Sequence, residues 1–196
     1  MIDFLIRKRR IIGVLAIAFT VACAWYFGRL AFFYPLDHCY PTIASPNSDS
    51  RPWGERIDCV VLHATAQNEM REATILFAHR GSGVSAHFVV GRDGRVVQMV
   101  PVERRAWHAG VSQLAGVGGV NDYSVGIEMV NRDDGRDPYT DAQYRAVAGI
   151  VRLLRTRLTI PDDRIVSHAQ IALPPGRKCD PLGFDFARLR RMLVRR

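Results

Sequence analysis

A loop near the C-terminal end, S-H-A-Q-I-A-L-P-P-G-R-K-C-D-P-L-G (residues 167–183), combines several side chains that could do chemistry. It carries His168, Lys178 and Asp180, and the proline after Asp180 restricts the backbone of that aspartate. A segment so rich in proline and glycine cannot form a regular hydrogen-bonded ladder, so its shape needs another constraint. A metal ion bound by His168 and Asp180 would supply one.

A second histidine, His63, stands at the polar end of I-D-C-V-V-L-H-A-T (residues 57–65), an apolar segment typical of a buried strand. His168 likewise ends a short apolar segment at 164–169. Polar residues at strand ends gather at one edge of an α/β sheet. Two imidazoles and the carboxylate of Asp180 would leave one position of a tetrahedral zinc ion open, as a catalytic site requires. We therefore predict one zinc ion per chain at this edge.

Spacing alone does not separate a metal ligand from an ordinary structural histidine, because the two candidates lie far apart in the chain. A structural role is the expectation for His79 and His87. His108 lies beside Trp107 in R-A-W-H-A-G and could line a cleft. Together with Asn121, these two residues are the candidates for substrate binding.

Glu128 lies in V-G-I-E-M-V, inside a strand predicted over residues 123–131. Alternation places it on the opposite face from Ile127 and Met129. A carboxylate without a partner is costly there, so Glu128 either pairs with a cation or belongs to a working site, where it could act as a base. Lys178 could place a positive charge where an oxyanion develops, although an ordinary loop lysine is the alternative.

Strands alternate with helices along the chain, which predicts an α/β fold with a mixed central β-sheet flanked by helices in a single catalytic domain. Thr140 and Gln143 form a capping box that opens one helix. The expected elements are strands at 57–65, 123–131 and 164–169, a hairpin at 85–100, a helix from an Asn68 cap to a Gly81 stop, a helix with the apolar face Tyr144, Val147, Val151, Leu154 and Leu158, and a helix at 184–194.

The N-terminal segment has a different character. Basic residues 7–10 precede an uncharged apolar run at 11–28, which predicts a signal peptide or a membrane-spanning anchor within residues 1–34. The apolar run continues past a small-residue cleavage site, which favours the uncleaved anchor. Residues 35–56 are predicted to be a linker and 57–196 the domain. We expect an exported, periplasmic protein anchored to the inner membrane by this run.

The net charge of +8 suggests an anionic partner. Without residues 1–34, however, 22 Lys and Arg face 18 Asp and Glu, and the net charge falls to +4. The remaining excess lies in the C-terminal tail, which is either a solvated helix face or a surface that attracts an anionic envelope polymer or membrane. We expect no nucleic-acid partner.

Cysteine chemistry gives little support for another kind of enzyme. Outside the N-terminal segment, Cys39, Cys59 and Cys179 are odd in number and provide no disulfide framework. A cysteine hydrolase is disfavoured, because Cys59 lies in the middle of a strand and no nucleophile-bearing turn surrounds Cys179.

Seven motifs occur in order: V-V-L-H-A-T-A, V-S-A-H-F-V-V-G-R-D-G-R-V-V-Q-M-V-P, R-A-W-H-A-G-V-S, N-D-Y-S-V-G-I-E-M-V-N, Y-T-D-A-Q-Y, S-H-A-Q-I-A and G-R-K-C-D-P. Together they resemble the zinc-dependent N-acetylmuramoyl-L-alanine amidases of type 2, a family that includes phage amidases and animal peptidoglycan recognition proteins. The resemblance covers about residues 57–190.

The resemblance implies roles for individual residues: zinc ligation by His63, His168 and Asp180, proton transfer by Glu128 and transition-state stabilisation by Lys178. The family usually has D-P-G where this chain has D-P-L-G. The additional Leu182 puts the turn after Asp180 in question, but not the ligand itself.

The implied reaction is hydrolysis of the amide bond between N-acetylmuramic acid and L-alanine of the peptidoglycan stem peptide. The partners would be peptidoglycan or muropeptides, and the membrane through the N-terminal segment. The alternative is a non-catalytic peptidoglycan-binding module of the same fold, which typically lacks a metal ligand. The sequence leaves open whether intact sacculus, released muropeptides or the anhydro form is preferred, and it does not set the oligomeric state.

Overall fold

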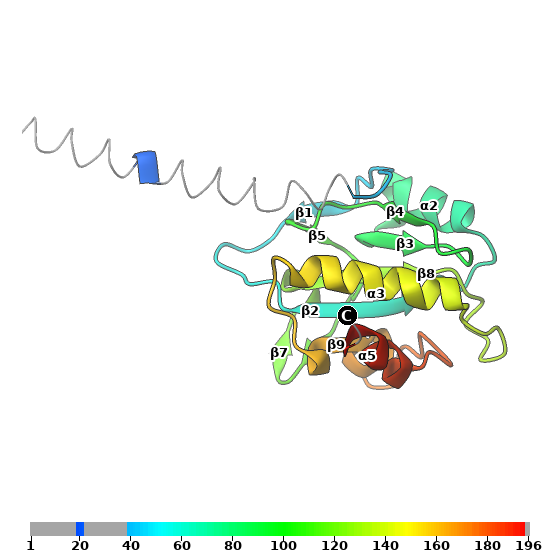
Figure 1. Cartoon of the computed structure of the whole chain (residues 1–196). Coiled ribbons are helices and arrows are strands. Elements are labelled where there is room, and N and C mark those ends of the chain that lie inside the picture. The colour runs from blue at the N-terminus through cyan, green and yellow to red at the C-terminus, as the bar shows by residue number, and fades with distance from the viewer. Residues whose placement is uncertain (1–18, 22–38, 195–196) are drawn as a thin grey trace, which may run out of the picture. The chain divides into compact units, whose positions relative to one another are not determined.

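The computed structural model describes residues 19–21 and 39–194 (Figure 1). The chain divides into two compact units, Met1–Pro35 and Leu36–Arg196, and the second contains the sheet. The predicted anchor at 11–28 lies outside the described residues, apart from 19–21, which are helical. Within the described ranges, no helix combines the length and apolar character needed to cross a bilayer.

The central sheet has five strands: β2 (Cys59–Ala64), β3 (Phe88–Val90), β4 (Val96–Gln98), β8 (Ser124–Met129) and β9 (Ile165–Ser167). They lie in the order β4-β3-β8-β2-β9 (Figure 1). β3, β8, β2 and β9 run parallel to their neighbours, whereas β4 pairs with β3 as an antiparallel hairpin. The predicted mixed sheet with helices is confirmed.

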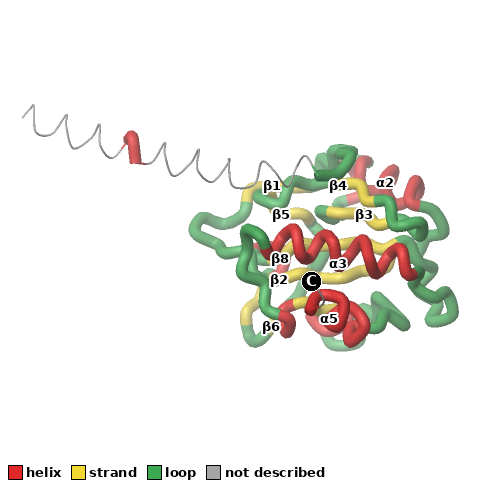
Figure 2. Tube along the Cα trace, viewed as in Figure 1, coloured by secondary structure: helices red, strands yellow, loops and turns green. Residues whose placement is uncertain are grey.

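Helices and two small ribbons complete the domain. Helix α3 (Asp141–Arg155) crosses in front of the sheet in Figure 1, and Figure 2 shows α5 (Phe186–Val194) beside it. Two shorter helices are α2 (Met70–Ala78) and the single-turn α4 (His168–Ile171). The ribbons pair β1 (Ser48–Ser50) with β5 (Arg104–Ala106), and β6 (Gln113–Leu114) with β7 (Val117–Gly118).

Helix α3 begins where its capping box predicts. The Thr140 hydroxyl accepts a hydrogen bond from the backbone N–H of Gln143 at 3.1 Å, and the Gln143 side chain accepts from the Thr140 N–H at 3.0 Å. The predicted apolar face is buried from Tyr144 to Leu154, whereas Leu158 lies beyond the end of the helix.

Helix α2 is shorter than the sequence predicts. Glu69, not Asn68, is the N-cap, because the Glu72 carboxylate accepts the backbone N–H of Glu69 at 3.2 Å in a capping box that propensity alone does not locate. The helix ends at Ala78, where the next residue turns to an extended conformation, before the predicted stop at Gly81.

The register of the parallel strands decides which side chains share a face of the sheet. His63 of β2 pairs with Glu128 of β8, and Val61 pairs with Gly126. Val89 of β3 pairs with Glu128 from the other side. Paired residues of adjacent strands point the same way, so these positions form one face, and Glu128 has the orientation predicted from alternation.

Two apolar clusters pack on this face. One joins Ala73 and Phe77 of α2 to Val89. The other joins Cys59 and Val61 of β2 to residues of the 109–123 segment, so Cys59 is a core residue. His63 and Glu128 stand on the same face, at the carboxyl ends of their strands.

The sequence predicts a linker over residues 35–56, but the described part, from residue 39 onward, packs on the domain. β1 pairs with β5, and Asn47 is only 1% exposed. Its side-chain amide donates to the carbonyls of Phe77 and His79 at 3.1 and 2.9 Å. Composition does not reveal this packing, because it is made by backbone pairing and single polar side chains.

Arg51 anchors the same segment. Its guanidinium is buried and donates hydrogen bonds of 2.8 to 3.2 Å to the backbone carbonyls of Val102, Asn121, Asp122 and Ser124. A buried charge is tolerated only when its donors are satisfied, so Arg51 is fixed to the chain that enters β8. The folded unit therefore begins before residue 57.

Candidate metal centre and active-site pocket

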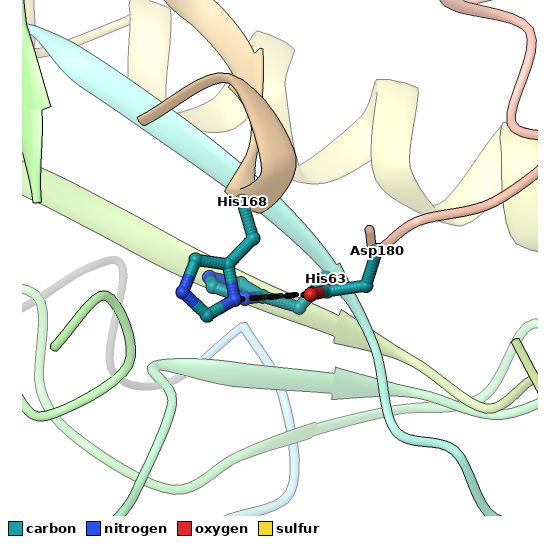
Figure 3. Close-up of side chains that lie close together, drawn as sticks. All are labelled: His63, His168 and Asp180. Carbon is teal, nitrogen blue, oxygen red and sulfur yellow. Dashed lines mark hydrogen bonds and ion pairs between the residues drawn. The ribbon is translucent and has the colours of Figure 1, made fainter. Parts of the chain in front are cut away.

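His63, His168 and Asp180 lie together at one edge of the sheet (Figure 3). His63 Nδ1 lies 3.3 Å from Asp180 Oδ2, and His168 Nδ1 lies 3.2 Å from Asp180 Oδ1. All three residues are buried, and one ligand atom from each lies within 4.8 Å of the others. The structure thus brings the three predicted ligands into a group that could hold a metal ion.

The strand register explains why the two histidines meet. His63 is near the carboxyl end of β2, and its predecessor Leu62 pairs with Ser167, the last residue of β9. The next residue, His168, therefore comes beside His63, with ring centroids 4.5 Å apart. The Ser167 hydroxyl accepts the backbone N–H of Gln170 at 3.1 Å and so caps the turn of α4 that begins with His168.

Hydrogen bonds within the protein hold the loop that carries Asp180. The Asp180 carbonyl accepts the backbone N–H of Ala169 at 3.0 Å. The additional residue Leu182 donates its backbone N–H to Asp133 Oδ1 at 2.7 Å. The departure from the D-P-G pattern is therefore accommodated by a specific contact, and Asp180 keeps its place in the group.

Arg177 fixes the first part of this loop. Its Nε donates to the Leu173 carbonyl at 2.7 Å, and its Nη2 donates to the Val111 carbonyl at 2.8 Å. The sequence reasoning missed both Arg177 and Asp133 as supports of the loop, which it expected a metal ion to hold. Nothing in their local sequence indicates partners so far away in the chain.

The hydrogen-bond partner of His168 Nε2 determines whether Nδ1 of the same ring carries a hydrogen or a lone pair. His168 Nε2 lies 3.3 Å from the carbonyl oxygen of Ala109, which can only accept a hydrogen bond. Nε2 of a neutral ring therefore carries the hydrogen, and Nδ1 presents a lone pair towards Asp180. Lone pairs that face one another repel unless a cation lies between them, so the arrangement fits a metal ion.

Burial and hydrogen bonding set the charge states of the group. Burial lowers the pKa of His63 to about 4, although the adjacent Asp180 carboxylate acts in the opposite direction. Burial acts to raise the pKa of Asp180, but its contacts with His168 and His63 outweigh burial and hold this pKa below its usual value. At neutral pH, His63 is therefore neutral and Asp180 ionised, which are the states that bind a metal.

Glu128 lies next to His63 on the adjacent strand. Its Oε2 is buried and has no hydrogen-bond partner among the described residues, although the residue as a whole keeps some exposure to the pocket. Burial raises the pKa of Glu128 to about 8; the charge of Asp180 also raises it, and that of Lys178 lowers it. A carboxyl that titrates near neutral pH in a pocket is a candidate for proton transfer.

The ligand group and Glu128 line one pocket of about 320 Å³. Lys178, which is exposed, and Trp107, which is partly buried, line the same pocket. Leu76 and Val84 add exposed apolar surface to its wall. The structure therefore brings Lys178 and Trp107 to the same cavity as the candidate ligands.

The other two predicted substrate contacts have different surroundings. Asn121 does not line the pocket; its Oδ1 accepts the backbone N–H groups of His108 and Ala109 at 3.1 and 2.8 Å. His108 borders the pocket, but its Nδ1 lies 3.1 Å from His63 Nε2 and its Nε2 lies 3.2 Å from Ser124 Oγ. Burial lowers the pKa of His108 well below its usual value, so its ring is neutral.

Residues 53–183 match the family described as N-acetylmuramoyl-L-alanine amidase. The chain belongs to this family. The 1,6-anhydro-N-acetylmuramyl-L-alanine amidase AmpD of Enterobacter cloacae is 36% identical over 172 residues, which cover 78% of this chain and 89% of that protein. AmpD of Citrobacter freundii is 45% identical over 112 residues, which cover 57% of this chain and only 58% of the relative.

Solved structures of amidases have the same fold as this chain. A crystal structure of a selenomethionine derivative of AmpD has a TM-score of 0.71 and 35% identity, over 79% of this chain and 94% of that one. Escherichia coli AmiD, in complex with anhydro-N-acetylmuramic acid-L-Ala-D-γ-Glu-L-Lys, has a TM-score of 0.61 and 29% identity, over 72% of this chain and 60% of that one. These matches support the α/β architecture expected for the family.

Cys179, next to Asp180 in the family motif, lies outside the ligand group. Its thiol is exposed and lies 3.6 Å from Asp133 Oδ2. The group in the described part of the chain that could hold a metal ion contains the neighbouring aspartate instead.

The raised pKa of Glu128 predicts how the stability of the metal-free protein depends on pH. The folded state keeps the Glu128 proton up to about pH 8, whereas the unfolded chain loses it near the usual value for glutamate. Glu128 therefore stabilises the fold at low pH, and this contribution is lost as the pH rises to about 8. The free energy of unfolding of the Glu128→Gln variant should therefore rise relative to that of wild type as the pH increases from about 5 to about 8.

Urea unfolding in the presence of a chelator, from about pH 5 to about pH 9, measures this difference. Glu55→Gln, which removes a carboxyl outside the pocket, is the matched control and should not reproduce the trend. A free-energy difference between wild type and Glu128→Gln that stays constant, or that changes in favour of wild type as the pH rises, would contradict the assigned environment.

Proposed function

We propose that this chain is an N-acetylmuramoyl-L-alanine amidase that hydrolyses the amide bond between the lactyl group of N-acetylmuramic acid and L-alanine of the stem peptide. The observation that carries the proposal is the convergence of His63, His168 and Asp180 in one pocket, next to Glu128. Membership of the amidase family supports the same reaction.

We assign zinc to this group, at one ion per chain, because two imidazoles and one carboxylate with an open fourth position are a ligand set of catalytic zinc. His63 and His168 would hold it through Nδ1 and Asp180 through a carboxylate oxygen. When bound, zinc supplies Lewis acidity that polarises the scissile carbonyl and lowers the pKa of water.

Glu128 is the proposed general base, which accepts a proton from the attacking water and passes it to the leaving amine. Its pKa of about 8 keeps it mostly protonated at neutral pH in the metal-free protein. Positive charge in the neighbouring group favours its carboxylate form. Glu128 would thus gain its basic form when the metal centre is complete.

Lys178 and Trp107 complete the proposed site. Lys178 contributes a positive charge that stabilises the oxyanion formed during attack on the carbonyl. Trp107 offers an aromatic surface in the same pocket as a contact for the substrate.

Anhydromuramyl peptides are the first substrates to test. AmiD was crystallised with such a molecule, and Pseudomonas aeruginosa AmpDh3, with 31% identity and a TM-score of 0.60 over 72% of this chain and 61% of that one, was crystallised with an anhydromuramic pentapeptide. Intact peptidoglycan belongs in the same assay, because the pocket alone does not distinguish these forms.

The purified full-length chain, supplied with zinc, should release from an anhydromuramyl peptide a free peptide that begins with L-alanine, and mass spectrometry identifies both products. Chelation should stop the reaction and added zinc should restore it. Binding of the muropeptide without cleavage would overturn the proposal in favour of a binding module.

Substitutions in the pocket separate the proposed roles. Glu128→Gln should keep zinc and substrate binding but lower turnover by about 100- to 10,000-fold, because it removes the base. Lys178→Ala should also keep zinc and lower turnover, whereas Asp180→Ala should lose metal affinity. Metal analysis beside a rate assay on one muropeptide measures these effects, with Glu55→Gln as control. Near-normal turnover of Glu128→Gln would exclude it as the base, and loss of zinc would place it among the ligands.

We also propose that the chain is exported and held at the inner membrane, so that the domain acts in the periplasm. The support is the basic sequence at 7–10 followed by the apolar run at 11–28. A C-terminal alkaline phosphatase fusion should be active in intact cells, and the same fusion without residues 1–34 should not. A full-length fusion that is inactive in intact cells, although it is expressed, would refute export.

A further inference from the structure

A chain of buried polar groups runs from β8 to the outer side of His63. Ser124 Oγ lies 2.5 Å from the carbonyl oxygen of Val120 and 3.2 Å from His108 Nε2. His108 Nδ1 then lies 3.1 Å from His63 Nε2. Ser124 is 0% exposed, His108 8% and His63 1%, so each contact is made away from bulk water.

The chemistry of the Ser124 end sets the direction of the hydrogen bonds as far as His108. The Val120 carbonyl can only accept, so the single hydroxyl hydrogen of Ser124 is donated to it. Ser124 Oγ must then accept from His108 Nε2, and a neutral imidazole carries only one ring hydrogen. His108 Nδ1 is therefore an acceptor that faces His63 Nε2 at 3.1 Å, and it draws the ring hydrogen of His63 to this side against the Asp180 carboxylate, which lies 3.3 Å from His63 Nδ1.

Among the described residues, no carboxylate is hydrogen-bonded to the His108 ring, whose nitrogens face His63 and Ser124. His63 lies on one side, with ring centroids 5.1 Å apart, and His87 lies on another, at 5.7 Å. The charged side chain of Arg51 lies in the same region, where it donates to the Ser124 carbonyl at 2.8 Å. A buried imidazolium would stand beside this positive charge without a counter-ion.

We propose that Ser124 and His108 are positioning residues that fix His63 in the tautomer with its hydrogen on Nε2, so that its Nδ1 lone pair is directed into the group formed with His168 and Asp180. The inference rests on the metal centre of the proposed function, but it concerns a property of the protein without metal. Neither positioning residue touches the reacting atoms. Their effect passes through the orientation of His63.

One short segment orients both histidine ligands. His108 holds His63 through its ring, and the adjacent residue Ala109 holds His168 through its carbonyl. Asn121 Oδ1 accepts the backbone N–H groups of both, at 3.1 and 2.8 Å, and so fixes the segment. The two inward-facing lone pairs are therefore set by a single support.

The sheet leaves room for this support at Gly126. A Cβ atom at this position would lie 2.5 Å from His108 Cγ and 2.6 Å from its Cδ2, closer than atoms can approach. Glycine therefore allows the His108 ring to lie directly on β8, between Ser124 and Glu128 on the same face.

Nitrogen-15 NMR of the imidazole groups in the metal-free full-length chain tests the proposal directly. The shifts of His63 should show a protonated Nε2 and an unprotonated Nδ1, and His108 should show the same tautomer. His63 with its hydrogen on Nδ1 would overturn the proposal, and this measurement needs no variant.

Ser124→Ala removes the hydroxyl at the end of this series of hydrogen bonds, so His108 loses the acceptor that fixes its tautomer. Part of His63 should then carry its hydrogen on Nδ1, and zinc affinity, measured by competition with a chelator, should fall by about 10- to 100-fold. Ser112→Ala is the matched control, because Ser112 is also buried and donates to a backbone carbonyl, that of Gly110 at 3.1 Å. Equal effects of the two substitutions on tautomer and affinity would contradict the proposal.

Variants of His108 give a second test that does not depend on the serine. His108→Asn places an amide oxygen near the position of Nδ1 and should keep His63 protonated on Nε2, whereas His108→Leu removes the acceptor and should not. If both variants bind zinc with the same affinity, His108 has no positioning role. A wild-type protein with the expected tautomers but no amidase activity would contradict the proposed function and leave this inference standing.

Discussion

Three electron-pair donors held face to face are the constraint on which the rest of this structure depends. Nδ1 of His63 and Nδ1 of His168 both point at the carboxylate of Asp180, at 3.3 and 3.2 Å. The fold places the ring hydrogen of His168 on the opposite side, against the Ala109 carbonyl. With the ring hydrogen of His63 also on its far side, as proposed above, this arrangement is repulsive by itself and becomes stable around a cation. The residues around the two histidines therefore serve to orient the rings so that both Nδ1 atoms face the Asp180 carboxylate.

The parallel strands of the sheet bring the site residues together without long connecting segments. β2, β8 and β9 end at one edge, so His63, Glu128 and His168 become neighbours through register alone. Two pKa values at this edge are shifted from their usual ranges in directions that suit hydrolysis. His63 is kept neutral by burial, and Glu128 is held near the point at which a neighbouring positive charge can ionise it. Ligation and proton transfer thus follow from one piece of backbone geometry.

The sequence predicts the parts of the site that follow from periodicity and strand ends. His63, His168 and Asp180 meet as expected, Glu128 faces as alternation requires, and α3 starts at its capping box. It does not predict the supports. Arg51, Asp133, Arg177 and Ser124 act through partners distant in sequence, which no local pattern encodes. The segment from residue 39 reads as a linker because its packing depends on isolated polar contacts rather than on an apolar periodicity.

Zinc K-edge X-ray absorption of the purified full-length chain tests the central claim, because it reports which atoms surround the metal. The account predicts a first shell of nitrogen and oxygen at about 2.0 to 2.2 Å, with the outer-shell scattering of two imidazole rings and no sulfur. A sulfur atom at about 2.3 Å would place Cys179 in the shell instead of Asp180 and contradict the ligand set. Scattering from fewer than two imidazoles would contradict the convergence of His63 and His168 on one ion.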